Sequence, residues 1–479
     1  MMKKSALAFL PLGLLAGCRT LGPDYERPEP QVPDAFRGLE AAPGADPEAP
    51  TFGDLPWVEA FGDPVLQGLV ETALRENHDV RIAAERVLQA RSFVTIARAD
   101  FYPDVVAGGR YEHMRVSEND PFPVPDEESD RWTAFGDLAW ELDFWGRFAR
   151  AAEAARGDLL ATEFARRAVI QGLVTELALS YFDLLLLDEQ LEITRRTYES
   201  RVKSFELVSL RLEQGVANKV EYHQSESLVL QSAGIVPDLE QLIEQQENRI
   251  RFLMGGNPSP IPRGHPLLGQ NRSVEVPVGL PSGLLERRPD VVQAESGLVA
   301  ANARIGEAKA LLYPTISLTA FGGFASEDLE DLVEGGSGFW SVVPSVTLPI
   351  FNAGRLRSNV EVTESQQREA AVRYTQTLQN AFREVADALL ALEKRREVRD
   401  WAEQLEATLD DQLELSRDRY HGGVTSYLEV LDSERDHFSS ELDLVQSIRD
   451  ELFSYVQLYR ALGGGWQGAE ELAAGTAGT

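Results

Sequence analysis

The sequence predicts a mainly α-helical fold with a small β part, built from long coiled helical hairpins in two tandem repeats. Three observations lead to this prediction. One very long stretch of the chain lacks both glycine and proline, an earlier stretch without proline has the same apolar pattern, and four short segments alternate between apolar and polar side chains. Long helices and short strands therefore belong to one repeated unit.

The longest helix is predicted from Arg355 to His421, because these 67 residues contain neither glycine nor proline. Its apolar residues follow a four-three spacing, which keeps one stripe on one helix face as in a coiled coil. These residues are Leu378, Phe382, Val385, Leu389 and Leu392. A helix rises about 1.5 Å per residue, so this one would extend roughly 100 Å. We expect an elongated body.

The same stripe occurs 208 residues earlier in the chain, at Ile170, Val174, Leu177, Tyr181 and Leu184. Each long helix ends at a glycine turn, at Gly215 and at Gly423, after which the chain returns as a second helix. The chain therefore divides into a first structural repeat with its hairpin and a second repeat with its own. Their bounds are 55–273 with a hairpin over 147–254, and 274–470 with a hairpin over 355–461.

A shorter helix precedes the strands of each repeat, over 64–100 and over 282–311. Each could stack end to end on the return helix of its own repeat, over 219–252 or 425–460. Pro237 lies in the first return helix and has Val445 as its counterpart, so we expect a kink in one repeat only.

Four segments have the period of two that is typical of β-strands. Their bounds are 104–116, 132–144, 315–324 and 339–348. In the second segment Trp132, Leu138 and Trp140 share one face, and Asp137 and Glu141 lie on the other. About ten alternating residues suit a tilted strand that crosses a membrane in a β-barrel. A strand of a soluble sandwich alternates in the same way, so the pattern alone leaves both possibilities open.

The number of strands limits how a membrane barrel could form. Four strands cannot close a barrel, and open strand edges in lipid leave backbone groups unpaired at a high cost in free energy. Several chains would therefore share one barrel, and a dimer, trimer or tetramer would supply eight, twelve or sixteen strands. Side chains fill an eight-stranded barrel, so a conduit favours three chains or more. The connections 117–131 and 325–338 would be outward-facing loops.

The composition points away from catalysis and from nucleic acid. A formal net charge of −31 disfavours binding to a phosphate backbone, but it fits an acidic groove or pore, or simply a soluble surface. The single cysteine provides no disulfide framework. The six histidines form no HExxH pattern, and the sequence contains neither a GxSxG motif nor a phosphate-binding loop. We expect neither an enzyme nor a bound metal or cofactor.

The N-terminus has the pattern of an exported lipoprotein. Residues 1–17 have the lysines and short apolar run of a signal peptide, too short for a membrane span of about 20 residues. Leu15-Ala16-Gly17-Cys18 resembles the lipobox of bacterial lipoproteins, which implies a covalent lipid on Cys18, whereas a buried cysteine is the alternative. Arg19, in place of an aspartate, implies delivery to the outer membrane. Residues 18–54 predict an extended, lipid-anchored tether, and 471–479 a disordered tail.

Specific motifs occur along residues 23–466 and link the chain to a known family. They include Phe61-Gly62-Asp63-Pro64, Trp140-Glu141-Leu142-Asp143, Arg287-Arg288-Pro289-Asp290, Asn352-Ala353-Gly354-Arg355 and Gly463-Gly464-Gly465-Trp466. Together they resemble the TolC-like outer-membrane efflux family, in particular its lipoprotein branch serving resistance-nodulation-division pumps. The resemblance implies a homotrimer that forms a twelve-stranded β-barrel in the outer membrane, continued by a twelve-helix periplasmic α-barrel. It also implies two partners, an inner-membrane resistance-nodulation-division transporter and a periplasmic adaptor (membrane fusion) protein.

A periplasmic gate is predicted just after the second glycine turn. Glu429 and Asp432 are three residues apart and share one helix face, so three chains would stack two carboxylate rings that attract cations. The resemblance places the family's acidic constriction on these two positions, and Tyr420 would contribute to latching. The alternative is that both are solvated acids on a helix exterior, paired with Arg435.

The two hairpin turns are candidate contacts for the adaptor. Gly215 with Val216, and Gly423 with Val424, are small enough for another hairpin to approach closely, although they could serve only to end the helices. The favoured function is a passive exit duct for drugs or other small molecules. The alternatives are a duct for type I protein secretion, which the lipobox disfavours, and a lipid-anchored coiled-coil scaffold without a pore.

Overall fold

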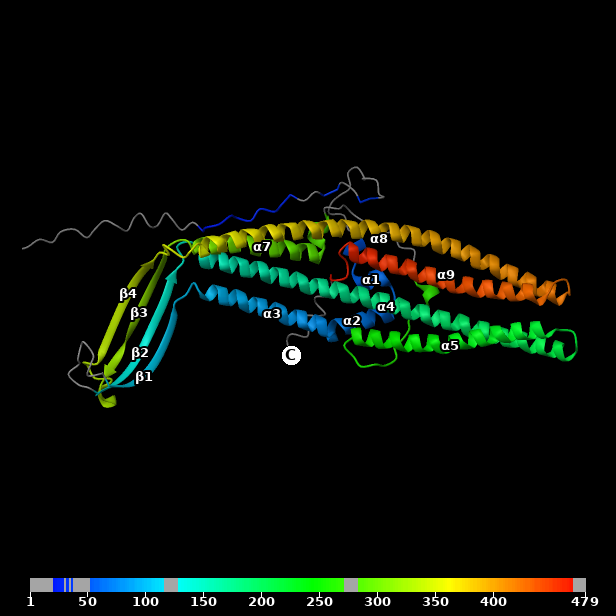
Figure 1. Ribbon diagram of the computed structural model, residues 1–479, viewed down its shortest axis with the longest axis horizontal. Helices are drawn as coiled ribbons and strands as arrows, with labels where there is room; N and C mark the ends of the chain where they lie inside the picture. Colours follow the sequence, from blue (N-terminus) through cyan, green and yellow to red (C-terminus); the bar gives the residue numbers. More distant parts are fainter. Residues whose placement is uncertain are drawn as a thin grey trace, which may run out of the picture. The chain divides into compact units, whose positions relative to one another are not determined.

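The computed structural model describes residues 20–29, 32–33, 36–37, 52–115, 128–270 and 283–467. The predicted signal peptide, Cys18, most of the tether and the tail at 471–479 lie outside these residues. The described helices are α1 (Trp57–Phe61), α2 (Pro64–Glu76), α3 (His78–Ala99), α4 (Arg147–Glu213), α5 (Lys219–Leu253), α6 (Leu284–Arg287), α7 (Pro289–Ala310), α8 (Arg355–His421) and α9 (Tyr427–Ala461) (Figure 1). The described strands are β1 (Asp104–Arg115), β2 (Glu128–Leu142), β3 (Thr315–Ser326) and β4 (Gly338–Thr347).

The two long helices confirm the central prediction, because α4 and α8 each run unbroken for 67 residues. The predicted stripe of α4, from Ile170 to Leu184, is buried, as expected for residues that pack against neighbouring helices. By length and composition α4 could also cross a membrane, but 72% of its apolar stretch is buried in the protein. We therefore interpret that stretch as a core segment.

Each of the two shorter helices is interrupted, which the sequence analysis did not predict. Asn77 separates α2 from α3, caps α3 with its side-chain oxygen, and donates a hydrogen bond from Nδ2 to the carbonyl of Leu253 (2.8 Å). In the second repeat Arg288 separates α6 from α7 and donates to the carbonyl of Ala461 (3.3 Å). Leu253 and Ala461 end the return helices α5 and α9, so each return helix meets the short helix of its own repeat, as predicted.

The described strands form one antiparallel sheet in the order β1-β2-β3-β4. The register brings Val105, Leu138, Ala320 and Val342 into one row across the four strands. A second row joins Glu141, Ser317 and Ser345, and the two serine hydroxyls lie 2.7 Å apart. The apolar and polar alternation of single strands therefore continues across the sheet. β4 is open to solvent along most of its length, with Trp340 81% exposed.

The predicted bounds of the second strand, 132–144, were wrong at both ends. β2 begins at Glu128 and ends at Leu142, so the connection predicted over 117–131 is shorter than expected, and its residues 117–127 lie outside the described part. The reason is cross-strand pairing, because Asp130 accepts a hydrogen bond from the Tyr111 hydroxyl and contacts the His113 ring, both at 2.8 Å. Asp130, which breaks the apolar and polar alternation of β2, is therefore stabilised by side chains of the neighbouring strand β1.

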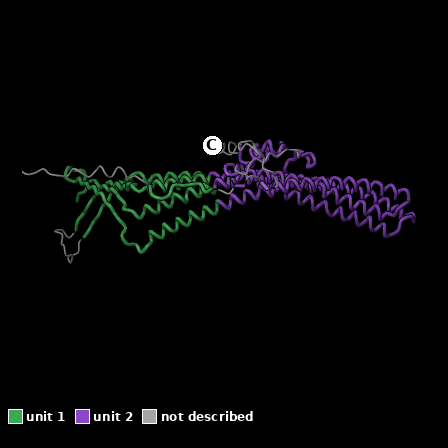
Figure 2. Tube along the Cα trace, turned by 90° about the horizontal axis from the view of Figure 1, so that it is seen from above, with its two compact units in different colours: residues 1–29, 87–162, 294–374 green, residues 30–86, 163–293, 375–479 purple. Residues whose placement is uncertain are grey.

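The chain divides into two compact units that do not coincide with the two repeats (Figure 2). Unit 1 contains residues 1–29, 87–162 and 294–374, and unit 2 contains 30–86, 163–293 and 375–479. Each unit takes segments from both repeats because α4 and α8 begin in unit 1 and continue into unit 2. The sheet belongs to unit 1, and both hairpin turns belong to unit 2.

Within unit 1 the described start of the tether is bound to α7 and α4. Arg27 forms a two-pronged ion pair with Glu295 (2.6 and 2.7 Å), and Arg150 donates to Asp24 (2.8 Å). A Cβ atom on Gly22 would lie 2.5 Å from a backbone atom of Gly306, so only glycine fits at this contact. Residues 20–29 are therefore held in place, as expected for a tether that runs over the protein.

Candidate functional site

The two hairpin turns have the same construction. Gly215 and Gly423 adopt left-handed backbone angles (φ 78° and 69°), which glycine tolerates best. The next residue in each turn, Val216 or Val424, donates its N–H to a carbonyl of the preceding helix at 2.9 Å. Both valine side chains remain exposed, at 65% and 72%. Each turn therefore ends its helix with a Schellman-type bond and presents an apolar side chain to solvent.

The candidate gate acids lie on the first turns of α9 and are both paired within the chain. Glu429 accepts a hydrogen bond from the Thr425 hydroxyl and lies 3.3 Å from Arg419 on α8. Asp432 lies 3.4 Å from Arg435, as the alternative interpretation expected. Their side chains are 40% and 54% exposed, so solvent reaches both.

These ion pairs do not neutralise the local charge. Arg435 is shared, because it also contacts Asp436 at 2.9 Å. Glu429, Asp432 and Asp436 therefore carry three negative charges against the two positive charges of Arg419 and Arg435. The surplus is one negative charge per chain among these five groups, and it lies on a partly exposed helix face. Such a surplus attracts cations.

Tyr420 lies behind the acids in a small apolar core. Its side chain is buried with Val208, Tyr427, Val430 and Leu431, and its ring centre lies 5.2 Å from that of Tyr427. Burial raises the pKa of Tyr420, which keeps the phenol neutral at physiological pH. The guanidinium of Arg211, from α4, lies 4.8 Å above the same ring. Tyr420 therefore joins the end of α8 to the end of α4.

The equivalent positions of the first repeat serve a different purpose. Glu221 and Gln224 correspond to Glu429 and Asp432 by the shift of 208 residues. Asn218 caps α5 through the N–H of Glu221 (3.1 Å) and donates in return to its carboxylate (2.9 Å). In α9 the cap residue Ser426 forms no such side-chain bond. Glu221 thus completes a helix cap, whereas Glu429 is available for other interactions.

The structure brings together all three predicted gate residues at the end of the second hairpin. Sequence reasoning named Arg435 as a partner but missed Arg419 and Arg211. Arg419 precedes Glu429 across a tight turn, so opposite charges flanking a hairpin turn could have indicated this pair. No local signal indicated Arg211, which comes from the other hairpin. Cys18, the predicted lipid site, lies outside the described residues.

Comparisons with known proteins agree with this arrangement. The family model described as outer membrane efflux protein matches residues 69–256 and 280–464, one stretch in each repeat. The chain is 36% identical to the solvent efflux pump outer membrane protein SrpC of Pseudomonas putida, over 97% of this chain and 99% of SrpC. It is 32% identical to the probable outer membrane lipoprotein SilC of Salmonella typhimurium, over 97% of this chain and 100% of SilC. The open state of the MtrE outer membrane channel of Neisseria gonorrhoeae matches with a TM-score of 0.85 at 29% identity, over 94% of this chain and 99% of MtrE.

Proposed function

The chain belongs to the outer membrane efflux protein family, and from this premise we propose that three copies form one passive exit duct for drugs or other small molecules. As a member of this transport family, the protein is the outer-membrane channel component of an efflux system. The trimer supplies a twelve-stranded β-barrel in the outer membrane and a twelve-helix α-barrel in the periplasm. The duct itself needs no bound cofactor, because the energy for transport comes from the inner-membrane pump.

The observation that carries this proposal is the open sheet of unit 1. In the described residues β1 and β4 each pair on one side only, and the apolar row through Val105 and Val342 extends to both edges. Exposed apolar strand edges are unstable in water, and in lipid they leave backbone groups unpaired. Pairing β4 of one chain with β1 of the next satisfies both edges and closes the sheet.

The ends of the hairpins supply the other two functions of the duct. The exposed Val216 and Val424 turns contact the periplasmic adaptor, which links the duct to a resistance-nodulation-division transporter. Glu429 and Asp432 form the periplasmic gate, where the surplus negative charge of each chain adds up in a trimer. Tyr420 supports this gate by fixing the end of α8 against α4.

A lipid on Cys18 anchors the tether in the outer membrane. The lipobox pattern and the likeness to a probable outer membrane lipoprotein support this anchor. Metabolic labelling with a radioactive fatty acid tests it: the wild type incorporates label, and Cys18→Ser does not. Label of equal strength in both proteins would reject Cys18 as the lipid site.

Deletion of the gene in its host tests the function. Cells without the protein become sensitive to drugs or solvents, and expression from a plasmid restores resistance. Loss of a secreted protein with unchanged resistance would instead indicate a type I secretion duct. Planar-bilayer recordings separate the remaining alternative, because a coiled-coil scaffold without a pore gives no conductance.

A further inference from the structure

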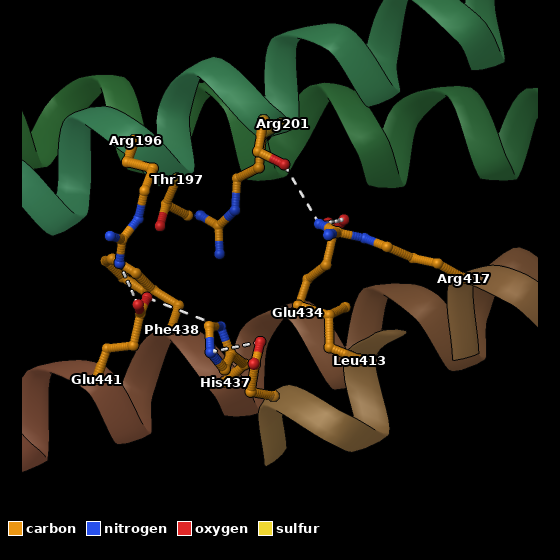
Figure 3. A pocket seen from close by; sticks show the side chains of 11 residues that line it. Arg196, Thr197, Arg201, Leu413, Arg417, Glu434, His437, Phe438 and Glu441 are labelled. Atoms are coloured by element: carbon orange, nitrogen blue, oxygen red, sulfur yellow. Dashed lines mark hydrogen bonds and ion pairs between the residues drawn. The ribbon is translucent and has the colours of Figure 1, made fainter. Parts of the chain in front are cut away.

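A pocket of about 170 Å³ lies between α4, α8 and α9 in unit 2, away from the glycine turns (Figure 3). Its lining is unusually rich in charge. On one side Arg417 pairs with Glu434 (2.9 Å), and Arg201 faces the same carboxylate. On the other side His437 and Glu441 of α9 lie below Arg196 of α4, as Figure 3 shows. The second side contains a group of side chains that the gate does not use.

His437 has carboxylates near both of its ring nitrogens, and a metal ion would bind one of these nitrogens. Its Nε2 atom lies 3.6 Å from Glu406 Oε1 and 3.4 Å from Asp410 Oδ1, and its Nδ1 atom lies 3.7 Å from Glu441 Oε2. One ligand atom each from Glu406, His437 and Glu441 lies within 4.8 Å of the other two. Two ligands of a tetrahedral metal, each about 2.1 Å from it, are about 3.4 Å apart.

The positions of these residues on their helices also suit a metal. His437 and Glu441 are four residues apart on α9, a spacing that places two ligands on one helix face. Glu406 and Asp410 have the same spacing on the facing helix α8. A bound ion would therefore join α8 to α9.

The charges around His437 leave room for a cation. Three carboxylates face one imidazole, and the one cation that the structure pairs with them here is Arg196, which binds Glu441. The Glu441 side chain is 11% exposed, whereas that of Arg196 is 63% exposed and can move into solvent. When Arg196 moves away, a divalent cation would balance two of the three negative charges.

We propose that Glu406, His437 and Glu441, with Asp410 as a further oxygen ligand, bind a divalent transition-metal ion such as Zn²⁺. The donor set selects the class of metal, because one imidazole with carboxylates suits Zn²⁺, Co²⁺ or Ni²⁺, whereas Mg²⁺ and Ca²⁺ prefer oxygen ligands alone. Binding releases Glu441 from Arg196. The ion holds α8 and α9 together and stabilises the hairpin. This site is independent of the proposed function of the duct.

Metal titration of the full-length protein in detergent tests the site. After removal of metals with a chelator, Zn²⁺ binding is measured by calorimetry and Co²⁺ binding by its visible absorption. We expect one ion per chain, and an affinity at least about tenfold weaker in His437→Ala and in Glu406→Gln. His223→Ala is the matched control, because His223 forms a pair with Glu226 on α5 (3.1 Å) but belongs to no such three-residue group among the described residues.

Arg196→Gln distinguishes a metal site from a purely structural charge cluster. Removal of the competing cation should strengthen Zn²⁺ binding several-fold, whereas loss of a structural ion pair would leave metal affinity unchanged. The proposal is overturned if the wild type binds no stoichiometric metal at millimolar zinc, or if His437→Ala binds it as tightly as the wild type. Circular dichroism of each variant checks that the helices remain folded.

Discussion

At the scale of single residues, the family motifs act as joints between helices, and Asp63 is the clearest case. Asp63 is fully buried and caps α2 through the N–H groups of Val65 and Leu66 (2.8 and 3.2 Å). Its second oxygen accepts three further hydrogen bonds, from the Tyr181 hydroxyl, the backbone N–H of His265 and the side chain of Gln270. One carboxylate therefore joins α2 to the long helix α4 and to the segment after α5.

Asp63→Ala should destabilise the protein strongly. The substitution removes the acceptor that the Tyr181 hydroxyl, the His265 N–H and the Gln270 side chain share, and it removes the cap, at a cost of roughly 3 kcal/mol or more. Thermal unfolding of the detergent-solubilised protein measures the effect. Asp79→Ala, an exposed acid at the start of α3, is the control and should change little. Equal midpoints of thermal unfolding for the two variants would show that Asp63 does not hold these helices together.

Asp63→Asn tests the charge of the same residue through its pH dependence. Burial alone would raise the pKa of Asp63, but hydrogen bonds from Gln270 and three backbone N–H groups outweigh burial and lower it. A carboxyl whose pKa is lower in the folded state adds stability at higher pH and loses it as the pH falls through the folded value. The wild type should therefore lose stability below about pH 4 more steeply than Asp63→Asn does. Parallel profiles of stability against pH would show that the charge of Asp63 does not contribute to this pH dependence.

At the scale of helices and turns, the proposed gate can be tested by substitution, with the equivalent positions of the first repeat as the control. Glu429→Ala/Asp432→Ala should raise single-channel conductance and weaken cation selectivity, because it removes the surplus negative charge and the Arg419 pair. Planar-bilayer recordings measure both quantities. Glu221→Ala/Gln224→Ala, at the equivalent positions of α5, should leave the traces close to wild type. Unchanged conductance and selectivity in Glu429→Ala/Asp432→Ala would show that these two residues are not the gate.

The exposed valines of the turns should be needed for adaptor binding. Val216→Asp/Val424→Asp places carboxylates on an apolar contact and should abolish drug resistance while the protein still reaches the outer membrane. Val216→Leu/Val424→Leu keeps the surface apolar and should retain resistance. Minimum inhibitory concentrations and co-purification of the adaptor measure the outcome. Full resistance in the aspartate variant would place the adaptor contact elsewhere.

The sequence predicts helices and turns well and contacts between them poorly. The range of α8 follows from the absence of glycine and proline, and both turns follow from their glycines, since these signals are local. The early start of β2 depends on the pairing of Asp130 with β1, and the break at Asn77 depends on contact with Leu253, 176 residues away. Such partners are set by tertiary packing, which no single segment encodes.

The same limit applies to the candidate sites. Glu429 and Asp432 could be selected from their spacing, and Arg435 could be named as a partner, but Arg419 became visible only in the fold. The group around His437 was missed entirely, because its ligands come from two helices and match no linear metal-binding motif. The two repeats and the two compact units divide the chain differently, because the long helices run through both units.

At the scale of the whole molecule, one physical requirement connects the sheet to the function. Each chain contributes four described strands with an apolar row and two edges that pair on one side only, as expected for the proposed barrel shared between chains in lipid. The proposed trimer, gate rings and duct all depend on that closure. An isolated chain would expose these edges and aggregate or remain unfolded in water.

Electron microscopy of the protein purified in detergent tests this requirement most directly. The account predicts particles with three-fold symmetry, in which β4 of each chain pairs with β1 of the next around a continuous barrel. A chain that stays folded and monomeric in water without detergent would contradict it.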